Sequence, residues 1–188
     1  MKYLNKIFLL GLLFILPIKA QIGLSFSAGP GFYERDLNLS SSAGFNFGVS
    51  YILKHNRSIG LEIHQNNLQQ QISTPLGSDL IPTSVKSLKL NYKDLLTGDL
   101  LSLMVYPQIS FGIINFQRNA YSVQLGAFGK KEIQALNKRY FVSSLAMNIS
   151  KNIYKQASLF IRPQVSVYDF ENYNKIFSIA GGIDVRLF

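Results

Sequence analysis

The sequence contains no cysteine and no tryptophan, and only two of its 188 residues are histidines, His55 and His64. The absence of cysteine excludes a disulfide scaffold, a thiolate metal site and a cysteine nucleophile. Two histidines are too few for a multi-histidine zinc site. We therefore expect no metal ion and no other cofactor in this protein.

Long hydrophobic runs are also scarce, and the longest lies within residues 1–20. Lys2 and Lys6 precede an apolar run from Ile7 to Ile18, and Ala20 supplies a small residue before Gln21. This order is typical of a cleaved secretory signal peptide. The run is shorter than the ~20 residues of a membrane-spanning helix, although an uncleaved anchor is the alternative interpretation. We expect residues 1–20 to be the signal peptide and residues 21–188 to form one domain.

Most of the remaining sequence alternates with a period of two. In residues 100–113 the odd positions are apolar, whereas the even positions include Ser102, Gln108 and Ser110. This period places apolar side chains on one face of a strand and polar or small ones on the other. The pattern recurs in eight segments, which are residues 22–32, 43–53, 57–70, 100–113, 120–129, 140–150, 157–168 and 176–188.

The length of these segments favours a membrane location. They span 10–14 residues, close to the ~9–11 of a tilted membrane strand. Their polar faces carry charges of both signs and many Gly and Ser residues, which suit a narrow polar lumen. We predict an all-β fold, an eight-stranded antiparallel transmembrane β-barrel in the outer membrane of a Gram-negative cell envelope. A soluble secreted β-barrel or sandwich, including a lipocalin-like fold, is the alternative.

The connections between the segments alternate in length, as a barrel with both ends in the periplasm requires. Short turns are expected at residues 54–58, 115–120 and 150–156, and extracellular loops at 33–42, 72–99, 130–139 and 169–175. Residues 84–93 within the second loop alternate weakly. Because a ninth strand would move the C-terminus to the other side, we interpret them as a β-extension or small hairpin above the membrane.

Several stretches resemble a known family. They are the signal ending at Ala20, the strand "IGLSFSAGPGF", the strand "VYPQISF" with Pro107, the strand "YSVQLGAFG" and a last strand that ends on Phe188. Together they resemble the small outer-membrane β-barrel proteins that include the PorT-like, porin-like group. The resemblance implies an eight-stranded barrel that the barrel-assembly machinery inserts by recognising the last strand. Phe188 departs from the pattern, since it is out of phase with the apolar face of that strand. Either Leu187 carries the insertion signal or a bulge lies near the end.

The polar faces supply the first candidate site. Its expected members all face the lumen, and they are Glu62, His64, Arg162, Asp184 and Arg186. If Tyr168 pairs with Ser178, then Arg162 lies directly opposite Asp184, and apolar residues such as Ile161 and Val185 pair on the outside. Leu103 and Val105 are expected to face lipid as well. We expect this network to plug the barrel and fix its register. Nothing in the sequence arranges His64 or a serine for catalysis, so no enzyme is predicted.

The second candidate site is a basic cluster at the third expected loop, formed by Lys130, Lys131, Lys138 and Arg139. Paired cations favour phosphate, so we expect contact with outer-membrane lipids and lipopolysaccharide. The alternative is a solvated loop that only aids solubility. The predicted function is a structural or surface-binding barrel, with protein partners but no nucleic acid at its loops. A PorT-like accessory of a secretion or assembly machine is the other hypothesis.

Overall fold

The computed structural model describes residues 21–33, 42–53, 57–74, 77–95, 97–100, 103–124, 126, 129–170 and 172–187. The expected signal peptide, His55, Phe188 and residues 34–41 of the first expected loop lie outside this part of the chain. No helix within it is long and apolar enough to span a membrane.

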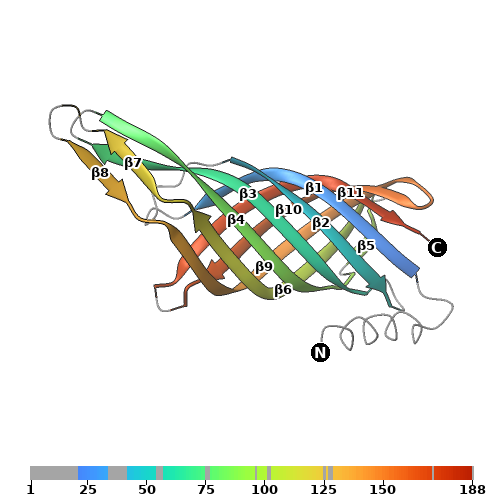
Figure 1. The fold of residues 1–188 in the computed structure, drawn as a ribbon. Coiled ribbons are helices and arrows are strands. Elements are labelled where there is room, and N and C mark those ends of the chain that lie inside the picture. Colours follow the sequence, from blue (N-terminus) through green and yellow to red (C-terminus); the bar gives the residue numbers. More distant parts are fainter. Residues whose placement is uncertain are drawn as a thin grey trace, which may run out of the picture.

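Eight of the eleven described strands form a closed antiparallel barrel (Figure 1). The barrel order is β4-β3-β2-β1-β11-β10-β9-β6, and β4 pairs with β6 to close it. The barrel strands are β1 (Gln21–Tyr33), β2 (Ser42–Ile52), β3 (Ser58–Thr74), β4 (Gly77–Lys93), β6 (Leu103–Arg118), β9 (Leu136–Tyr154), β10 (Ala157–Tyr168) and β11 (Asn174–Arg186). β5 (Thr97–Leu100) adds to the edge of β6, and β7 (Tyr121–Gln124) pairs with β8 (Lys130–Ile133) in a separate hairpin. The predicted fold class is therefore confirmed.

The barrel has two unlike ends. The proximal end holds Gln21 and Leu187, while the distal end holds the β7–β8 hairpin and the close of the β3–β4 hairpin (Figure 1). Four adjacent strands, β3, β4, β6 and β9, are 16 to 19 residues long, whereas the other four have 11 to 13. One side of the wall is therefore taller, and in Figure 1 it extends past the shorter strands at the distal end.

Two strand assignments from the sequence are wrong, and the two errors leave the total at eight. Residues 84–93 are not an extension above the membrane but part of barrel strand β4, paired with β3 and β6. Residues 120–129 are not a barrel strand, because Tyr121–Gln124 form β7, which pairs with β8 outside the barrel. Residues 115–120, expected as a periplasmic turn, consequently lie at the distal end, opposite to the chain termini.

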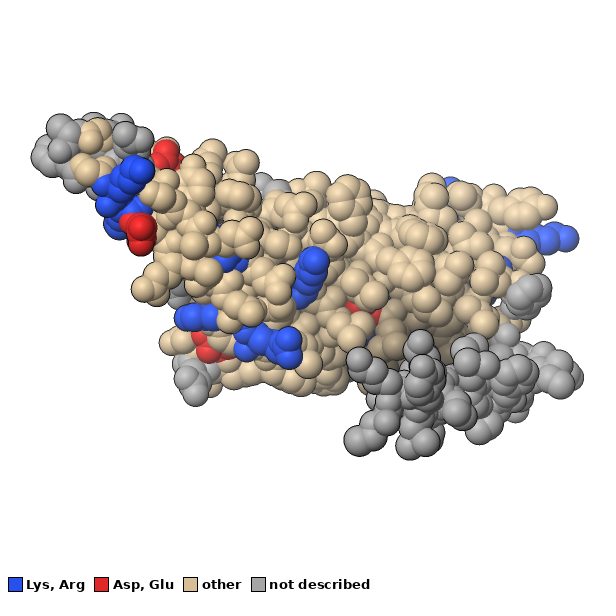
Figure 2. Space-filling model, in the orientation of Figure 1, with Lys and Arg blue, Asp and Glu red and all other residues tan. Residues whose placement is uncertain are grey.

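The outer face of the barrel is apolar, as the alternation predicts. Leu145 is 65% exposed, Ile161 is 57% exposed, and Leu61, Leu90 and Ile179 are exposed as well. Leu103 is exposed, and Val105 and Val185 are partly exposed. Figure 2 shows a largely uncharged outer face, with basic and acidic side chains gathered mainly toward the distal end. A soluble barrel or sandwich would bury this face, so the exposed apolar wall favours the membrane barrel over that alternative.

The register of the last hairpin differs from the predicted one by four residues. Tyr168 pairs with Asn174 instead of Ser178, and Arg162 pairs with Ala180 instead of Asp184, which lies opposite Ser158. The turn closes sooner than expected because Asp169 and Tyr173 both adopt positive φ angles, 50° and 54°. A shift by an even number of residues keeps every side chain on its face, so the apolar pattern fits both registers.

Candidate functional site

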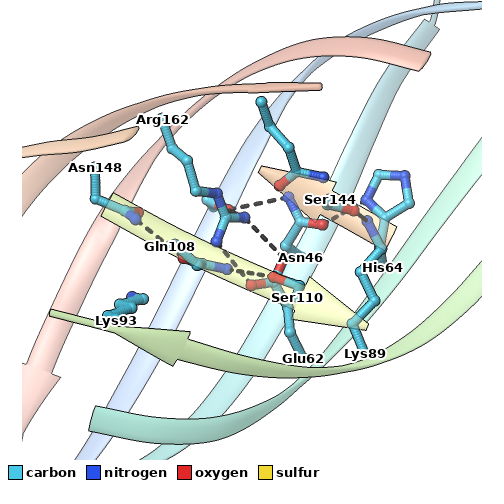
Figure 3. A network of polar contacts seen from close by, with 12 residues as sticks. Asn46, Glu62, His64, Lys89, Lys93, Gln108, Ser110, Ser144, Asn148 and Arg162 are labelled. Carbon is cyan, nitrogen blue, oxygen red and sulfur yellow. Dashed lines mark hydrogen bonds and ion pairs between the residues drawn. The ribbon is translucent and has the colours of Figure 1, made fainter. Parts of the chain in front are cut away.

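A buried ion pair crosses the barrel interior. Arg162 on β10 donates two hydrogen bonds to the Glu62 carboxylate on β3, at 2.7 and 2.8 Å. Arg162 is 2% exposed and Glu62 is 4% exposed. Three strands separate β3 from β10 in the barrel order, so the pair spans the lumen (Figure 3). A bidentate, fully desolvated pair of this kind fixes the two walls in one relative position.

A chain of polar side chains continues from Arg162 toward β2. Arg162 Nη2 and Asn46 Nδ2 both donate to Ser27 Oγ, at 3.4 and 3.1 Å. Asn46 Oδ1 faces Nδ1 of His64, which must therefore carry the proton in this contact. Gly44 makes room for the ring, because a Cβ at that position would lie 2.6 Å from His64 Cε1. His64 is thus held beside the ion pair by its hydrogen bond to Asn46.

A second cation, Lys89 on β4, lines the same small cavity as Arg162, His64 and Asn46. We call these four side chains, together with Glu62, the polar layer of the lumen. The Lys89 ammonium donates to Ser144 Oγ at 3.0 Å and to Ser166 Oγ at 3.4 Å, and these hydroxyls contact each other at 2.8 Å. Lys89 is only 7% exposed. On the neighbouring strand it pairs with Gly112, where a Cβ would come within 2.7 Å of Lys89 Cα. The glycine therefore permits the close approach of β4 and β6 at this point.

The proximal part of the lumen holds the other predicted charges. Lys93 Nζ lies 3.7 Å from Asp184 Oδ2. Together with Arg186 and Tyr106 these two side chains line a cavity of about 60 Å³. Asn148 also lines this cavity, and its Nδ2 donates to Gln108 Oε1 at 3.0 Å. Asp184 and Arg186 therefore form a proximal group, apart from the Glu62–Arg162 pair.

The distal part of the interior is apolar. Its cluster, which we call the distal apolar cluster, has 0–7% exposure throughout and consists of Leu68, Val85, Ile114, Phe116, Val142, Tyr168 and Ile176. Phe116, Tyr140 and Tyr168 pack ring against ring, with centroids 5.1 to 6.0 Å apart. The interior thus changes along its axis from polar at the proximal end to apolar at the distal end.

The sequence places the five lumen residues on the correct face but does not group them correctly. The structure joins Glu62 to Arg162 and places Asp184 with Lys93, not with Arg162. Lys89 and Lys93 are absent from the predicted site, because residues 84–93 are expected above the membrane on sequence grounds. The alternation of Ser87, Lys89 and Asn91 with leucines is the signal that could have revealed them. No group of three His, Cys, Asp or Glu residues that could hold a metal occurs among the described residues.

The four predicted phosphate ligands are exposed at the distal end. Lys130 and Lys131 lie on β8, whereas Lys138 and Arg139 lie near the start of β9. Arg139 pairs with Asn115, which in turn pairs with Lys86 on β4. Lys86 is exposed, so it adds a fifth cation to the four predicted ones. The basic side chains therefore occupy both the hairpin and the outer rim beneath it.

No family model matches the sequence, and no curated protein is detectably similar. Solved structures do match. Ail, the attachment invasion locus protein of Yersinia pestis, in complex with the heparin analogue sucrose octasulfate, is 13% identical with a TM-score of 0.58, over 90% of this chain and 100% of that chain. Neisserial surface protein A is 9% identical with a TM-score of 0.55, over 88% and 96%.

A major outer membrane protein from Thermus thermophilus matches in the same way, at 12% identity and a TM-score of 0.57, over 88% of this chain and 99% of that chain. These matches support outer-membrane barrels as a group and do not support the PorT-like assignment, which stays a prediction. Such low identities show the fold alone. This chain has the eight-stranded fold of the small outer-membrane β-barrel proteins.

Proposed function

We propose that this protein resides in the outer membrane as a barrel closed to ion flow and binds polyanionic molecules, chiefly lipopolysaccharide, at its distal end. The observation that carries the proposal is the set of five exposed cations at that end, Lys86, Lys130, Lys131, Lys138 and Arg139. The apolar outer face supports the membrane location. The long connection between β6 and β9, which holds the β7–β8 hairpin, lies at the distal end, and this predicts that the distal end faces outward from the cell.

The order of charge along the barrel supports lipopolysaccharide as the ligand. Apolar side chains such as Leu88, Ile113 and Phe141 are exposed on the outer wall. Lys86 lies two residues from Leu88 along β4, and Arg139 lies two residues from Phe141 along β9, in both cases on the distal side. A lipid with acyl chains and phosphates meets both surfaces at once, with its phosphates at the cations. The Ail structure, for comparison, is of a complex with the heparin analogue sucrose octasulfate.

The basic residues are expected to set the affinity for this ligand. Changing Lys130, Lys131, Lys138 and Arg139 together to Gln should weaken binding to lipopolysaccharide vesicles about tenfold, because four exposed charge pairs of a few tenths of a kcal/mol sum to about 1.4 kcal/mol. The matched control replaces Arg57, Lys151 and Lys155, exposed cations of the proximal end, by Gln. Equal affinities of wild type and the distal variant, or equal losses in both variants, would dispose of the proposal.

The interior supports the proposal of a closed barrel. The Glu62–Arg162 pair occupies the middle of the lumen and the distal apolar cluster fills the part above it. An eight-stranded barrel has an interior just wide enough for side chains to fill. The wild-type protein should therefore show no steady conductance steps in planar bilayers. A stable open channel under these conditions would contradict the closed barrel. It would not bear on the binding of lipopolysaccharide, which is measured separately.

We also propose that the protein is not an enzyme. Among the residues that the structure describes, the nearest approach to a nucleophile with a base is Lys89 beside Ser144 and Ser166. All three are at most 7% exposed, within the lumen. A substrate carbonyl or phosphate would need to reach a hydroxyl at about 3 Å, and the buried hydroxyls leave little room for it.

Fractionation with a heat-modifiability gel tests the proposed membrane location, since a closed barrel in outer membranes migrates differently before and after boiling.

A further inference from the structure

We propose that the polar layer of the lumen binds one small inorganic anion, with a halide such as chloride as the expected ligand. The site is a cavity of about 30 Å³ lined by Lys89, Arg162, Ser87, Ser166 and His64, among others. It lies between the Glu62–Arg162 pair and the distal apolar cluster, since Ile114 and Ile176 of that cluster also line it. This inference is independent of the surface function proposed above.

The charge balance of the layer calls for an anion. Lys89 and Arg162 bring two positive charges, and Glu62 brings one negative charge. Both oxygens of that carboxylate already accept from Arg162. Lys89 has no carboxylate within ion-pair distance among the described residues. An unpaired charge within a membrane-embedded barrel is costly, and buried charges are normally paired or bound to an ion.

Hydrogen-bond donors at the cavity remain available for such a ligand. An ammonium has three protons, and the hydroxyls of Ser144 and Ser166 account for two of those on Lys89. Ser87 is 4% exposed. Its Oγ, like Arg162 Nε, has no hydrogen-bond partner among the described residues. Three buried donor groups, two of them charged, therefore border one small enclosed space.

The size of the cavity selects the class of anion. A buried water needs about 10–15 Å³ of such space, so 30 Å³ admits one or two water-sized particles. A halide ion fits this volume, whereas a tetrahedral phosphate or sulfate with five heavy atoms does not.

Bromide provides the direct test, because its anomalous scattering distinguishes it from water. Wild-type protein refolded from denaturant in bromide, which allows the enclosed site to fill, should give an anomalous peak in the cavity within hydrogen-bonding distance of Lys89 Nζ. Peaks only at surface lysines, or ordered water in the cavity without anomalous signal, would overturn the proposal.

Two variants separate a specific site from general salt effects. Ser87→Ala should lose most of the bromide peak, and Lys89→Met should lose all of it. The matched control is Ser150→Ala, since Ser150 is equally buried, at 3%, but lines the proximal cavity instead. At constant ionic strength, the urea midpoint of wild type and of Ser150→Ala should be higher in bromide than in gluconate. This difference in urea midpoint between bromide and gluconate should disappear in Ser87→Ala. If it persists in Ser87→Ala, the proposed anion site is refuted, and this test holds even if Lys89→Met fails to fold.

Discussion

Replacing Glu62 by glutamine is expected to lower the free energy of unfolding in lipid vesicles by about 3–5 kcal/mol, as the loss of one partner of a buried ion pair does. The substitution preserves the shape of the side chain but leaves the buried Arg162 guanidinium without its counter-charge. Lys89 and Lys93 also act on Glu62, so its removal leaves three cations without this negative charge. Because the chain has no tryptophan, the measurement should use circular dichroism or the gel shift of the folded barrel.

Two controls make this prediction specific. Asp94→Asn breaks the Arg57–Asp94 pair, whose side chains are 54% and 35% exposed, and should cost less than about 1 kcal/mol. The double variant Glu62→Gln with Arg162→Met should recover most of the loss, since a buried pair replaced by apolar and neutral groups is often neutral in stability. If Glu62→Gln and Asp94→Asn prove equally mild, the buried pair does not stabilise the barrel.

The sequence predicts the faces of the strands better than it predicts the strands themselves. Alternation alone places Ile161 outside and Arg162 inside, because a strand has a period of two. It fails for residues 84–93, because residues 120–129 are already counted as a barrel strand and a ninth strand would move the C-terminus to the other side of the membrane. Inside a polar lumen a lysine such as Lys89 is compatible with a barrel strand, so the alternation of Ser87, Lys89 and Asn91 with leucines is the valid signal at this position.

The opposite error concerns residues 120–129, which alternate as well as a barrel strand does. Of the residues in this range that the structure describes, four pair with β8, in a hairpin that lies beyond the barrel. The pattern cannot separate these cases, since a two-stranded hairpin imposes the same period. Nothing local in the sequence marks the place where the barrel wall ends and the hairpin begins.

The contents of the lumen depend on geometry that no single strand contains. Glu62 and Arg162 lie 100 residues apart and belong to strands that are not neighbours. Their contact follows from closure of the barrel and from the stagger between strands, which a residue pattern does not specify. The pattern can therefore identify which charged residues face inward, but it pairs Arg162 with Asp184, the only acid on the adjacent strand.

Replacing Leu145 by arginine is expected to lower the free energy of unfolding in the membrane by about 2–4 kcal/mol, which is the cost of a cation on the lipid face near the midplane. Leu145 is 65% exposed and lies on the outer wall of β9. Its partners on both sides, Ile109 and Val165, are exposed and apolar as well. The arginine would have no polar group of these neighbours to contact, and lipid would surround its charge.

Gln117→Arg is the matched control for this substitution. Gln117 is exposed on the neighbouring strand β6, at the distal end, where it pairs with Asn137 on β9 and Ser84 on β4. Near the membrane interface an arginine costs only about 0–1 kcal/mol, so this variant should insert and fold almost as wild type does. Refolding yield into vesicles and the urea midpoint report both effects. Equal behaviour of Leu145→Arg and Gln117→Arg would show that the apolar outer wall of β9 does not contact lipid, and the membrane location proposed for the barrel would then fail.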